Sequence, residues 1–429
     1  MISTASAHLA PKEHCTGCSA CASGCPRGAI KMVADKEGFL YPQVTDACVH
    51  CGHCTHICPA LKHREQRPEP TVFAVWNEDE AQRRLSTSGG AFAAIAGFVL
   101  ESGGVVFGAA MDGDMRVVHT AIQSKEDLPR LMGTKLVQSD MGECFQQVRY
   151  YLDRGTFVFF TGTPCQVDGL YRYLGESPEL LLTADTLCSG VPSPGVWSKV
   201  VDAMHYIKQR RVTAVQFCKK LTGSESRFVV DFEGGGQYDA PLGKSDYGRG
   251  LFRGLFLRPA CYHCTCCSTN RVADLTFGSF KGLPSDFYPQ QQKLGVSMLL
   301  INTVKGAHIF DMIPLHREKR TPPRISTAPS MPPWRRRWPE TRLSVILQPS
   351  PRSAPPSLMP LSISRSTRSI SAFSPYPIGR TGWRMRESSA ISFAAFNPER
   401  RMRHDQNSAA HLLRPLLRLL CGAAAHRGH

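Results

Sequence analysis

Eight cysteines within the first sixty residues repeat one spacing twice, and this repeat constrains the fold more than any other feature of the chain. The two runs are Cys15, Cys18, Cys21, Cys25-Pro26 and Cys48, Cys51, Cys54, Cys58-Pro59. The CxxCxxCxxxCP spacing is typical of cysteine thiolates that hold 4Fe-4S clusters. Zinc also binds CxxC pairs, but a triplet followed by a distant Cys-Pro, present twice, favours iron and sulfide. The segment is therefore predicted to fold around metal clusters.

In such runs the first three cysteines hold one cluster and the fourth crosses to the other cluster, as in two-cluster ferredoxins. The predicted sets are Cys15, Cys18, Cys21 and Cys58 for one cluster, and Cys48, Cys51, Cys54 and Cys25 for the other. Between the two runs, residues 30–44 resemble a hairpin that turns at Asp35 to Gly38. Residues 1–66 are thus predicted to form a ferredoxin-type domain that carries single electrons.

Length and cysteine usage limit the class of protein. The chain has 429 residues and 17 cysteines, enough for two or three domains. Its opening letters, MISTASAHLA, lack the charged start and long apolar stretch of a secretory signal. Thiolate ligation is therefore favoured over disulfides, and the expected location is cytoplasmic. The longest apolar run, residues 90–100, is too short to span a bilayer.

The positive charge of the chain is concentrated in its last quarter. Residues 321–429 hold 17 Arg, no Lys and four acidic residues, for a net charge of +13, whereas the first 320 residues carry +3. The same tail holds 15 of the 31 prolines, a composition that cannot build regular helices or a continuous core. We interpret it as a disordered, out-of-frame tail produced by a frameshift, with a genuine basic arm as the alternative. The charge gives no support to nucleic-acid binding.

The sequence pattern after residue 66 is that of an α/β domain, with an amino-terminal part at residues 67–155 and a carboxyl-terminal part at residues 156–320. Expected strands cover residues 71–76, 104–110, 157–161, 212–217 and 227–232, and expected helices cover residues 89–101, 140–153 and 167–174. Strands that alternate with helices favour a mostly parallel or mixed sheet. The predicted architecture is a small ferredoxin-like domain, a mixed-sheet α/β domain and then the disordered tail.

Four short sequence motifs distinguish this α/β domain from others. They are STSGG (residues 86–90), GTPCQ (162–166), GVPSP (190–194) and RPACYHC (258–264). With this combination, residues 1–310 resemble the beta-subunit family of coenzyme F420 hydrogenases and dehydrogenases, iron-sulfur flavoproteins that include members with a fused ferredoxin module. The resemblance implies FAD, a further 4Fe-4S cluster in the flavin domain, and electron exchange with a deazaflavin or another soluble redox partner.

The residues assigned to flavin binding are Ser86, Ser88, Gly89, Gly90, Lys135 and Thr163. The first four open a helix, where free backbone N–H groups and the positive helix end favour a phosphate. An ordinary helix cap is the alternative for them. Lys135 occupies a turn beside Gly133, where a cation would meet a phosphate or a reduced, anionic flavin. A solvated surface lysine is the alternative there.

The further cluster that the resemblance implies is assigned to Cys165, Cys188, Cys261 and Cys264. Cys165 follows a buried strand and Cys188 ends a second apolar segment, so both are expected at the carboxyl edge of the sheet, where open α/β folds bind ligands. Together with the CxxC pair they supply four thiolates. Cys266 and Cys267 leave the choice among the last four cysteines open, and Cys165 and Cys188 as ordinary buried cysteines are the alternative.

Some positions depart from the family or stay ambiguous. The family reads GDFWG where this chain has residues 278–282, so Ser279 and Lys281 replace an aspartate and a tryptophan. If that aspartate helps to hold the cluster or the flavin, this site is weakened. Arg271 and Asp274 match their motif, with a structural pair between the two as the alternative to a functional role.

The expected function is an iron-sulfur flavoprotein oxidoreductase. It would relay electrons between a hydride donor or acceptor, either coenzyme F420 or another soluble substrate, FAD and 4Fe-4S clusters. The alternatives are a non-catalytic electron-transfer subunit that docks a catalytic partner, and an inactive product truncated by the tail. The sequence has no Walker loop, HExxH motif or serine-histidine-aspartate arrangement, so hydrolysis and nucleoside triphosphate chemistry have no support. Substrate, electron direction and oligomeric state stay open.

Overall fold

The computed structural model describes residues 9–62, 66–220 and 226–320. The predicted tail, residues 321–429, lies outside the described residues, so its disorder and the frameshift stay predictions. In the part that the structure describes, no helix is both long enough and apolar enough to cross a membrane.

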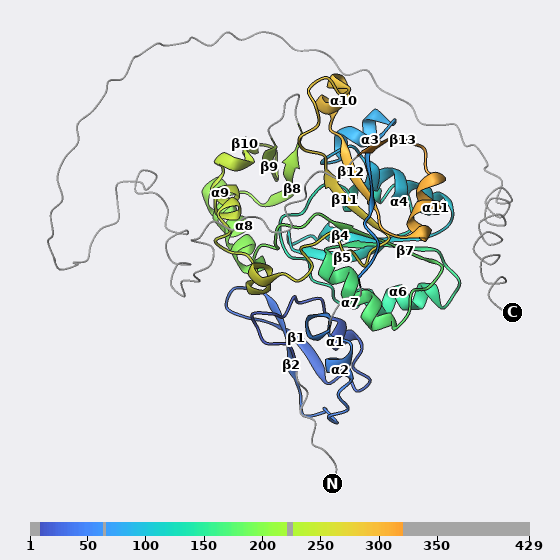
Figure 1. Cartoon of the computed structure of the whole chain (residues 1–429). Helices are drawn as coiled ribbons and strands as arrows, with labels where there is room; N and C mark the ends of the chain where they lie inside the picture. The colour runs from blue at the N-terminus through green and yellow to red at the C-terminus, as the bar shows by residue number, and fades with distance from the viewer. Residues whose placement is uncertain (1–8, 63–65, 221–225, 321–429) are drawn as a thin grey trace, which may run out of the picture. The chain divides into compact units, whose positions relative to one another are not determined.

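The amino-terminal module is built from two short helices and a hairpin (Figure 1). Its elements are α1 (Ala20–Ser23), β1 (Ile30–Ala34), β2 (Leu40–Val44), α2 (His53–His56) and a 3-10 turn, η1 (Pro59–Leu61). β1 and β2 pair antiparallel, with Ile30 opposite Val44. At the turn, Asp35 Oδ1 accepts hydrogen bonds from the backbone N–H groups of Glu37 and Phe39 at 2.9 and 3.0 Å. The predicted hairpin is confirmed.

Among the described residues, eight strands form the main sheet (Figure 1). In spatial order they are β13 (Leu315–Arg320), β3 (Thr71–Asn77), β12 (Ser297–Ile301), β11 (Leu275–Ser279), β7 (Leu181–Thr186), β6 (Val158–Gly162), β4 (Val105–Met111) and β5 (Val117–Ile122). The four strands β11, β7, β6 and β4 run parallel, and the remaining pairs are antiparallel. The carboxyl ends of the parallel strands therefore share one edge, the usual ligand-binding edge of an open α/β sheet.

Two apolar cores cover the opposite faces of this sheet. Because alternate strand residues face opposite sides, Phe159 belongs to one core and Phe160 to the other. The first core includes α4 (Ala91–Glu101) and α11 (Val304–Asp311), and the second includes α6 (Cys144–Leu152) and α7 (Pro164–Leu174), as Figure 1 shows. The predicted mixed-sheet α/β class is confirmed.

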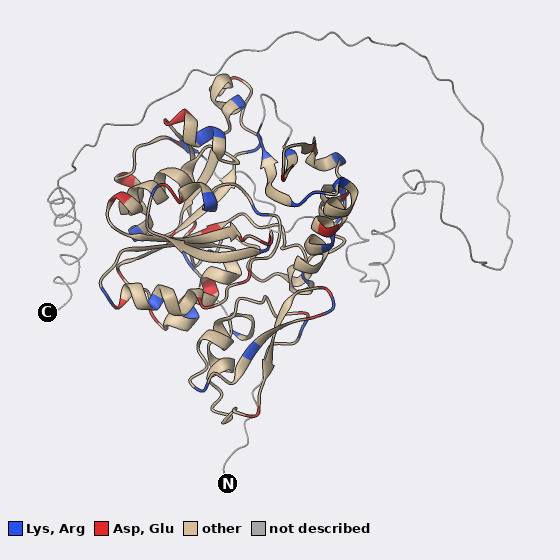
Figure 2. Cartoon of the chain, turned by 180° about the vertical axis from the view of Figure 1, so that it is seen from behind, with Lys and Arg blue, Asp and Glu red and all other residues tan. Residues whose placement is uncertain are grey.

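A smaller antiparallel sheet lies beside the main one. It consists of β10 (Gln237–Pro241), β9 (Arg227–Phe232) and β8 (Val212–Lys219), and packs with α8 (Pro194–Lys208) and α9 (Asp246–Phe252). Trp197, Phe217 and Tyr247 contact one another in this core. The remaining elements are α3 (Glu80–Leu85), α5 (Leu128–Leu131), α10 (Pro289–Leu294), η2 (Leu242–Lys244) and η3 (Pro259–His263). Figure 2 shows Lys and Arg interspersed with Asp and Glu over the elements seen from this side.

The amino-terminal module docks on the α/β domain at several points. Cys18 and Ala20 belong to the core under α7, and a Cβ added to Gly169 of α7 would lie 3.0 Å from Cys18 Sγ. At the hairpin tip, a Cβ on Gly38 would lie 2.4 Å from the backbone N of Gly195 in α8. Only glycine allows so close an approach of two backbones. The two domains therefore share a closely packed boundary.

Most predicted elements form with small shifts at their ends. The strand expected at residues 227–232 coincides with β9. The helix expected from residue 140 begins only at Cys144, because Asp140 still bridges to Val118 and Gly142 has a φ of +45°. The helix expected from residue 167 begins at Pro164, because proline is favoured in a first turn and Thr163 N donates to Gln166 Oε1 at 2.8 Å as in a capping box.

Candidate metal centres

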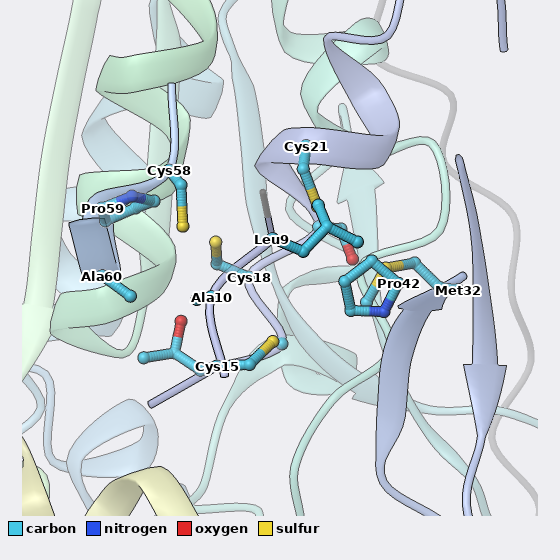
Figure 3. A pocket seen from close by; sticks show the side chains of 13 residues that line it. Leu9, Ala10, Cys15, Cys18, Cys21, Met32, Pro42, Cys58, Pro59 and Ala60 are labelled. Atoms are coloured by element: carbon cyan, nitrogen blue, oxygen red, sulfur yellow. The ribbon is translucent and has the colours of Figure 1, made fainter. Parts of the chain in front are cut away.

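The structure gathers the eight amino-terminal cysteines into the two predicted sets. One cavity is lined by Cys15, Cys18, Cys21 and Cys58, and a second by Cys25, Cys48, Cys51 and Cys54. Figure 3 shows the four sulfur atoms of the first set around a shared space, with Met32 and Pro42 on one side and Pro59 and Ala60 on the other. The fourth cysteine of each run thus lies with the other run, as cluster crossing requires.

The two cysteine loops repeat the same backbone path. Two residues after the first cysteine of each run, Gly17 and His50 have φ values of 69° and 53°; four residues after it, Ser19 and Gly52 have φ values of 66° and 75°. A left-handed conformation costs a non-glycine residue about 1–2 kcal/mol. Both loops then enter a short helix, α1 or α2, at the equivalent position. The duplicated spacing therefore corresponds to a duplicated, strained loop that turns its thiols inward.

Backbone N–H groups approach several of the sulfur atoms. Ala29 N lies 3.3 Å from Cys25 Sγ, and His50 N lies 3.4 Å from Cys48 Sγ. Burial raises the pKa of the Cys18 thiol to about 12, and the neighbouring thiols oppose its ionisation further. Cations reverse this effect, because a coordinating thiol is deprotonated outright. The loops are therefore suited to hold thiolates when a metal cluster supplies the positive charge.

A third group of cysteines lies at the carboxyl edge of the main sheet. Cys165 follows β6, Cys188 follows the parallel strand β7, and Cys261 belongs to η3. Burial raises the pKa of Cys188 to about 12, and the nearby charge of Cys261 adds to this effect. Val191 N donates to Cys261 Sγ at 3.4 Å. The edge predicted for Cys165 and Cys188 is where the structure places them.

Cys266 is the cysteine of this group that sequence reasoning left undecided. Its thiol contacts both Cys165 and Cys264, and these contacts, followed by burial, raise the pKa of each of those two thiols. Cys266 is itself buried, whereas Cys264 is exposed. Five thiols therefore converge, one more than a cluster needs. Across residues 9–62, 66–220 and 226–320, no three Cys, His, Asp or Glu side chains meet closely enough to hold a single metal ion.

The loop predicted to bind the flavin phosphates makes mainly internal contacts. Ser86 Oγ donates to Gln82 O and Ser88 Oγ to Val296 O, both at 2.9 Å, while Gly89 N donates to Ser297 Oγ at 2.9 Å. Gly90, with a φ of +84°, is the residue that caps α4. The serines therefore anchor the loop to β12 and α3, and neither serves as the side-chain cap of α4.

The predicted lysine turn lies against this loop. Thr134 donates through both its N–H and its hydroxyl to Thr87 Oγ1, at 2.9 and 3.0 Å. Lys135 Nζ donates to the carbonyl oxygens of Arg130 and Met132 at 3.0 and 2.7 Å. Burial lowers the pKa of Lys135 to about 7. The structure thus brings the two predicted flavin segments together.

Thr163 belongs to a buried network that includes a histidine missed by sequence reasoning. Thr163 Oγ1 lies 3.1 Å from Cys165 Sγ and donates to Gln166 Oε1. Gln166 Nε2 donates to Ser139 Oγ, which lies 2.8 Å from His119 Nδ1. Burial lowers the pKa of His119 to about 4, so its ring is neutral near neutral pH. Because His119 lies in a strand, far from any motif, no local signal marks it.

The expected alternative of an Arg271–Asp274 pair is wrong. Arg271 lies 3.5 Å from Asp185, in a fully buried arrangement beside Cys188. Asp274 instead accepts hydrogen bonds from the backbone and hydroxyl of Thr183, each at 2.9 Å. Ser279 ends β11 at the same sheet edge.

Comparison with known proteins places two segments of the chain. Residues 14–62 match the family model of a 4Fe-4S dicluster domain, and residues 156–318 match the family model for the C terminus of the coenzyme F420 hydrogenase/dehydrogenase beta subunit. An uncharacterized ferredoxin of Methanocaldococcus jannaschii is 31% identical over 51 residues, which are 12% of this chain and 66%, just under two thirds, of the ferredoxin.

A chain from the F420-reducing NiFe hydrogenase complex of Methanosarcina barkeri is similar with a TM-score of 0.40 and 17% identity, over 59% of this chain and 82% of that chain. Residues 14–62 are therefore similar to 4Fe-4S dicluster domains, and residues 156–318 are similar to the carboxyl-terminal region of the coenzyme F420 hydrogenase/dehydrogenase beta subunit.

Proposed function

We propose that this protein is an iron-sulfur flavoprotein oxidoreductase. It would move electrons between a soluble hydride donor or acceptor, FAD, a third 4Fe-4S cluster and the two ferredoxin clusters. The observation that carries the proposal is the succession of thiol groups: one at the carboxyl edge of the main sheet, and two in a ferredoxin module docked against the same domain. Coenzyme F420 is one substrate of suitable chemistry, because the matching family is named for it.

The proposed ligands of the ferredoxin clusters are Cys15, Cys18, Cys21 and Cys58, and Cys48, Cys51, Cys54 and Cys25. For the third cluster they are Cys165, Cys188, Cys261 and Cys264. The donor set fits, since four thiolates complete a 4Fe-4S cluster. Cys266 contacts the thiols of both Cys165 and Cys264, so its thiol can replace that of Cys264 if this ligand is lost.

The proposed flavin site lies at the same sheet edge. The loop that contains Ser86, Ser88, Gly89 and Gly90 would border the cofactor together with Lys135 and Thr163. When bound, FAD exchanges electron pairs with organic substrates and single electrons with clusters. Protonated Lys135 would stabilise negative charge on a phosphate or on the reduced ring. The Thr163 hydroxyl lies 3.1 Å from Cys165 Sγ and would turn its single hydrogen from Gln166 Oε1 to the Cys165 thiolate when a cluster is bound.

The packing supports one order of electron transfer. Cys18 of the first ferredoxin set packs on Gly169, one helical turn after Cys165 in α7. Cys51 of the second set is exposed. We therefore infer that electrons pass from the third centre to the Cys15 set, then to the Cys48 set, and from there to a soluble redox partner. The reverse direction uses the same path.

One observation favours a second candidate, a relay subunit without its own flavin. The hydroxyls of Ser86 and Ser88 and the N–H of Gly89 already have partners within the protein. In that case the α/β domain would dock a catalytic partner and only conduct electrons.

Anaerobic purification with quantitation of iron, sulfide and flavin tests the proposal. The oxidoreductase predicts three four-iron clusters and bound FAD that is bleached by a hydride donor. The relay predicts the clusters without FAD. Stoichiometric zinc and no paramagnetic signal after reduction with dithionite would refute both.

Single variants then test the third centre. Cys165→Ala is expected to lose about one third of the iron, since one of three four-iron clusters is lost. Cys144→Ala, a buried cysteine in α6, is the matched control and should keep all iron. Cys264→Ser should retain part of the third cluster through Cys266, and the Cys264→Ser/Cys266→Ser double variant should lose it. Equal iron in Cys165→Ala and Cys144→Ala would remove the third cluster from the proposal.

A further inference from the structure

Arg258 is a fully buried arginine that reaches from the α/β domain into the first cysteine loop of the ferredoxin module. Its Nε donates to Cys15 O at 2.7 Å, and its Nη2 donates to Leu40 O at 2.9 Å. Nη1 donates to Gln138 Oε1 at 2.9 Å. Nη2 also lies 3.7 Å from Cys15 Sγ, and the guanidinium is 4.2 Å from the centre of the Tyr41 ring.

In the described residues, no carboxylate is hydrogen-bonded to this guanidinium. In the part of the chain that the structure describes, Arg258 takes part in no ion pair, and its other hydrogen-bond acceptors are neutral oxygens. A buried charge is costly unless an opposite charge accompanies it. Among the hydrogen-bond partners of Arg258, the group that can carry negative charge is the Cys15 thiolate, with the cluster that it would hold. Arg258 therefore matches an anionic centre at this position.

Arg258 also connects this centre with the third one. Its backbone N donates to Val191 O at 2.9 Å, and Val191 N donates to Cys261 Sγ at 3.4 Å. Two residues, Arg258 and Val191, therefore join Cys15, a proposed ligand of one cluster, to Cys261, a proposed ligand of the next. The second ferredoxin set differs, because Arg27, the arginine that lines its cavity, is exposed to solvent.

We propose that Arg258 is a positioning and redox-tuning residue for the centre held by Cys15, Cys18, Cys21 and Cys58. It would hold the Cys15 loop against the α/β domain and stabilise the reduced, more negative state of this centre relative to the Cys48 set. The step concerned moves one electron from the third centre to the Cys15 centre and no proton, because an arginine stays protonated. This inference rests on the proposed function, since it needs both centres to be present.

The test is a redox titration of the full chain under anaerobic conditions, followed by electron paramagnetic resonance. Each ferredoxin centre is expected to give one reduction step. Cys51→Ser changes a ligand of the Cys48 set, so the step whose midpoint potential stays the same in this variant belongs to the Cys15 centre. In Arg258→Met the midpoint potential of this step is expected to become more negative by about 59 mV. For one electron, this shift corresponds to a tenfold lower ratio of reduced to oxidised centre at a given potential. Arg258→Lys keeps the charge and should shift less. Arg27→Met is the matched control and should leave both steps in place, because solvent screens its charge.

The outcomes separate this proposal from the function on which it rests. A wild-type protein without two ferredoxin centres would refute the proposed function. Two intact centres in Arg258→Met with unchanged midpoints would overturn the role of Arg258 alone. If Arg258→Met does not assemble the Cys15 centre, Arg258→Gln takes its place. Loss of only the Cys15 centre from both neutral variants, with retention in Arg258→Lys, supports the positioning role, whereas loss of both centres from all three variants contradicts it.

Discussion

The two halves of the ferredoxin module share one ligand spacing and one loop geometry but differ in their surroundings. The Cys15 set lies against the α/β domain, with Cys18 buried in the core beneath α7 and Arg258 beside Cys15. In the Cys48 set, by contrast, Cys51 is exposed, and so is the neighbouring Arg27. Spacing and backbone path therefore determine that a cluster can form, while the contacts made by the rest of the chain determine what that cluster can do. An inner and an outer centre arise from one repeated motif.

The largest expected effect separates the inner centre from the outer one. Cys18→Ser should stop electron transfer from the proposed third centre to an external acceptor, because it removes a ligand of the centre that we propose to lie between them. Cys51→Ser should leave reduction of the inner centre intact and impair only its delivery of electrons to the acceptor. Rapid-mixing spectroscopy of both variants measures these steps. If Cys51→Ser slowed reduction of the inner centre as much as Cys18→Ser, the proposed order would be wrong.

A pair of glycine substitutions sharpens the comparison of the two loops. Gly17→Ala and Gly52→Ala both force alanine into a left-handed conformation, at a cost of about 1–2 kcal/mol each. A Cβ at Gly17 would also lie 2.7 Å from the Arg258 guanidinium, whereas a Cβ at Gly52 meets no atom within 4 Å. The Gly17 variant should therefore lose about 1–3 kcal/mol more of its free energy of unfolding. Anaerobic denaturant titration gives both values, and equal losses would show that Arg258 adapts freely.

The docking of the inner half on α7 can be tested with two helical glycines. Gly169→Ala places a methyl group 2.9 Å from Cys18 Cβ and is expected to destabilise the protein by about 1–3 kcal/mol. Gly97→Ala in α4 meets no atom within 4 Å and should stabilise it by about 0.5–1 kcal/mol, because alanine favours a helix. Thermal unfolding of the two variants distinguishes these signs. A stabilised Gly169→Ala would contradict the close packing of Cys18.

The smallest effect concerns pH. His119 lies in β5 of the α/β domain, at one end of the buried hydrogen-bond network that reaches Cys165. Burial lowers its pKa to about 4. In the unfolded chain His119 has the ordinary pKa of histidine, about 6.5, and therefore binds a proton at a higher pH than in the folded protein. The free energy of unfolding should therefore fall as the pH drops below about 6.5. The expected loss is about 1 kcal/mol between about pH 7 and about pH 5.5.

His119→Gln should flatten this dependence, since glutamine does not titrate. The exposed His205 provides the control, and its replacement by glutamine should leave the slope unchanged. Denaturant midpoints measured over this pH range give the slopes. Identical slopes for the wild type and His119→Gln would assign the pH dependence to other groups.

The sequence alone allowed prediction of whatever is encoded locally. Cysteine spacing predicted which thiols converge in the module, and apolar runs next to turns predicted β9 and the hairpin. The contacts that distinguish the two halves were beyond its reach, because Arg258 and Cys15 are 243 residues apart in the chain. His119 belongs to an edge strand and meets Ser139 only through tertiary packing. Chain-distant partners of this kind leave no periodic signal.

The facing glycines at the hairpin tip have a consequence for kinetics. Gly195 N donates to Glu37 O at 3.2 Å, and Ser193 Oγ donates to the same oxygen, so the tip is pinned to the start of α8. Contacts at this tip, at α7 and at Arg258 hold the module against the α/β domain. We therefore expect the proposed transfer across the domain boundary to proceed by tunnelling over a constant gap, without a diffusive search. Solvent viscosity should leave that transfer unaffected and slow only the encounter with the external acceptor.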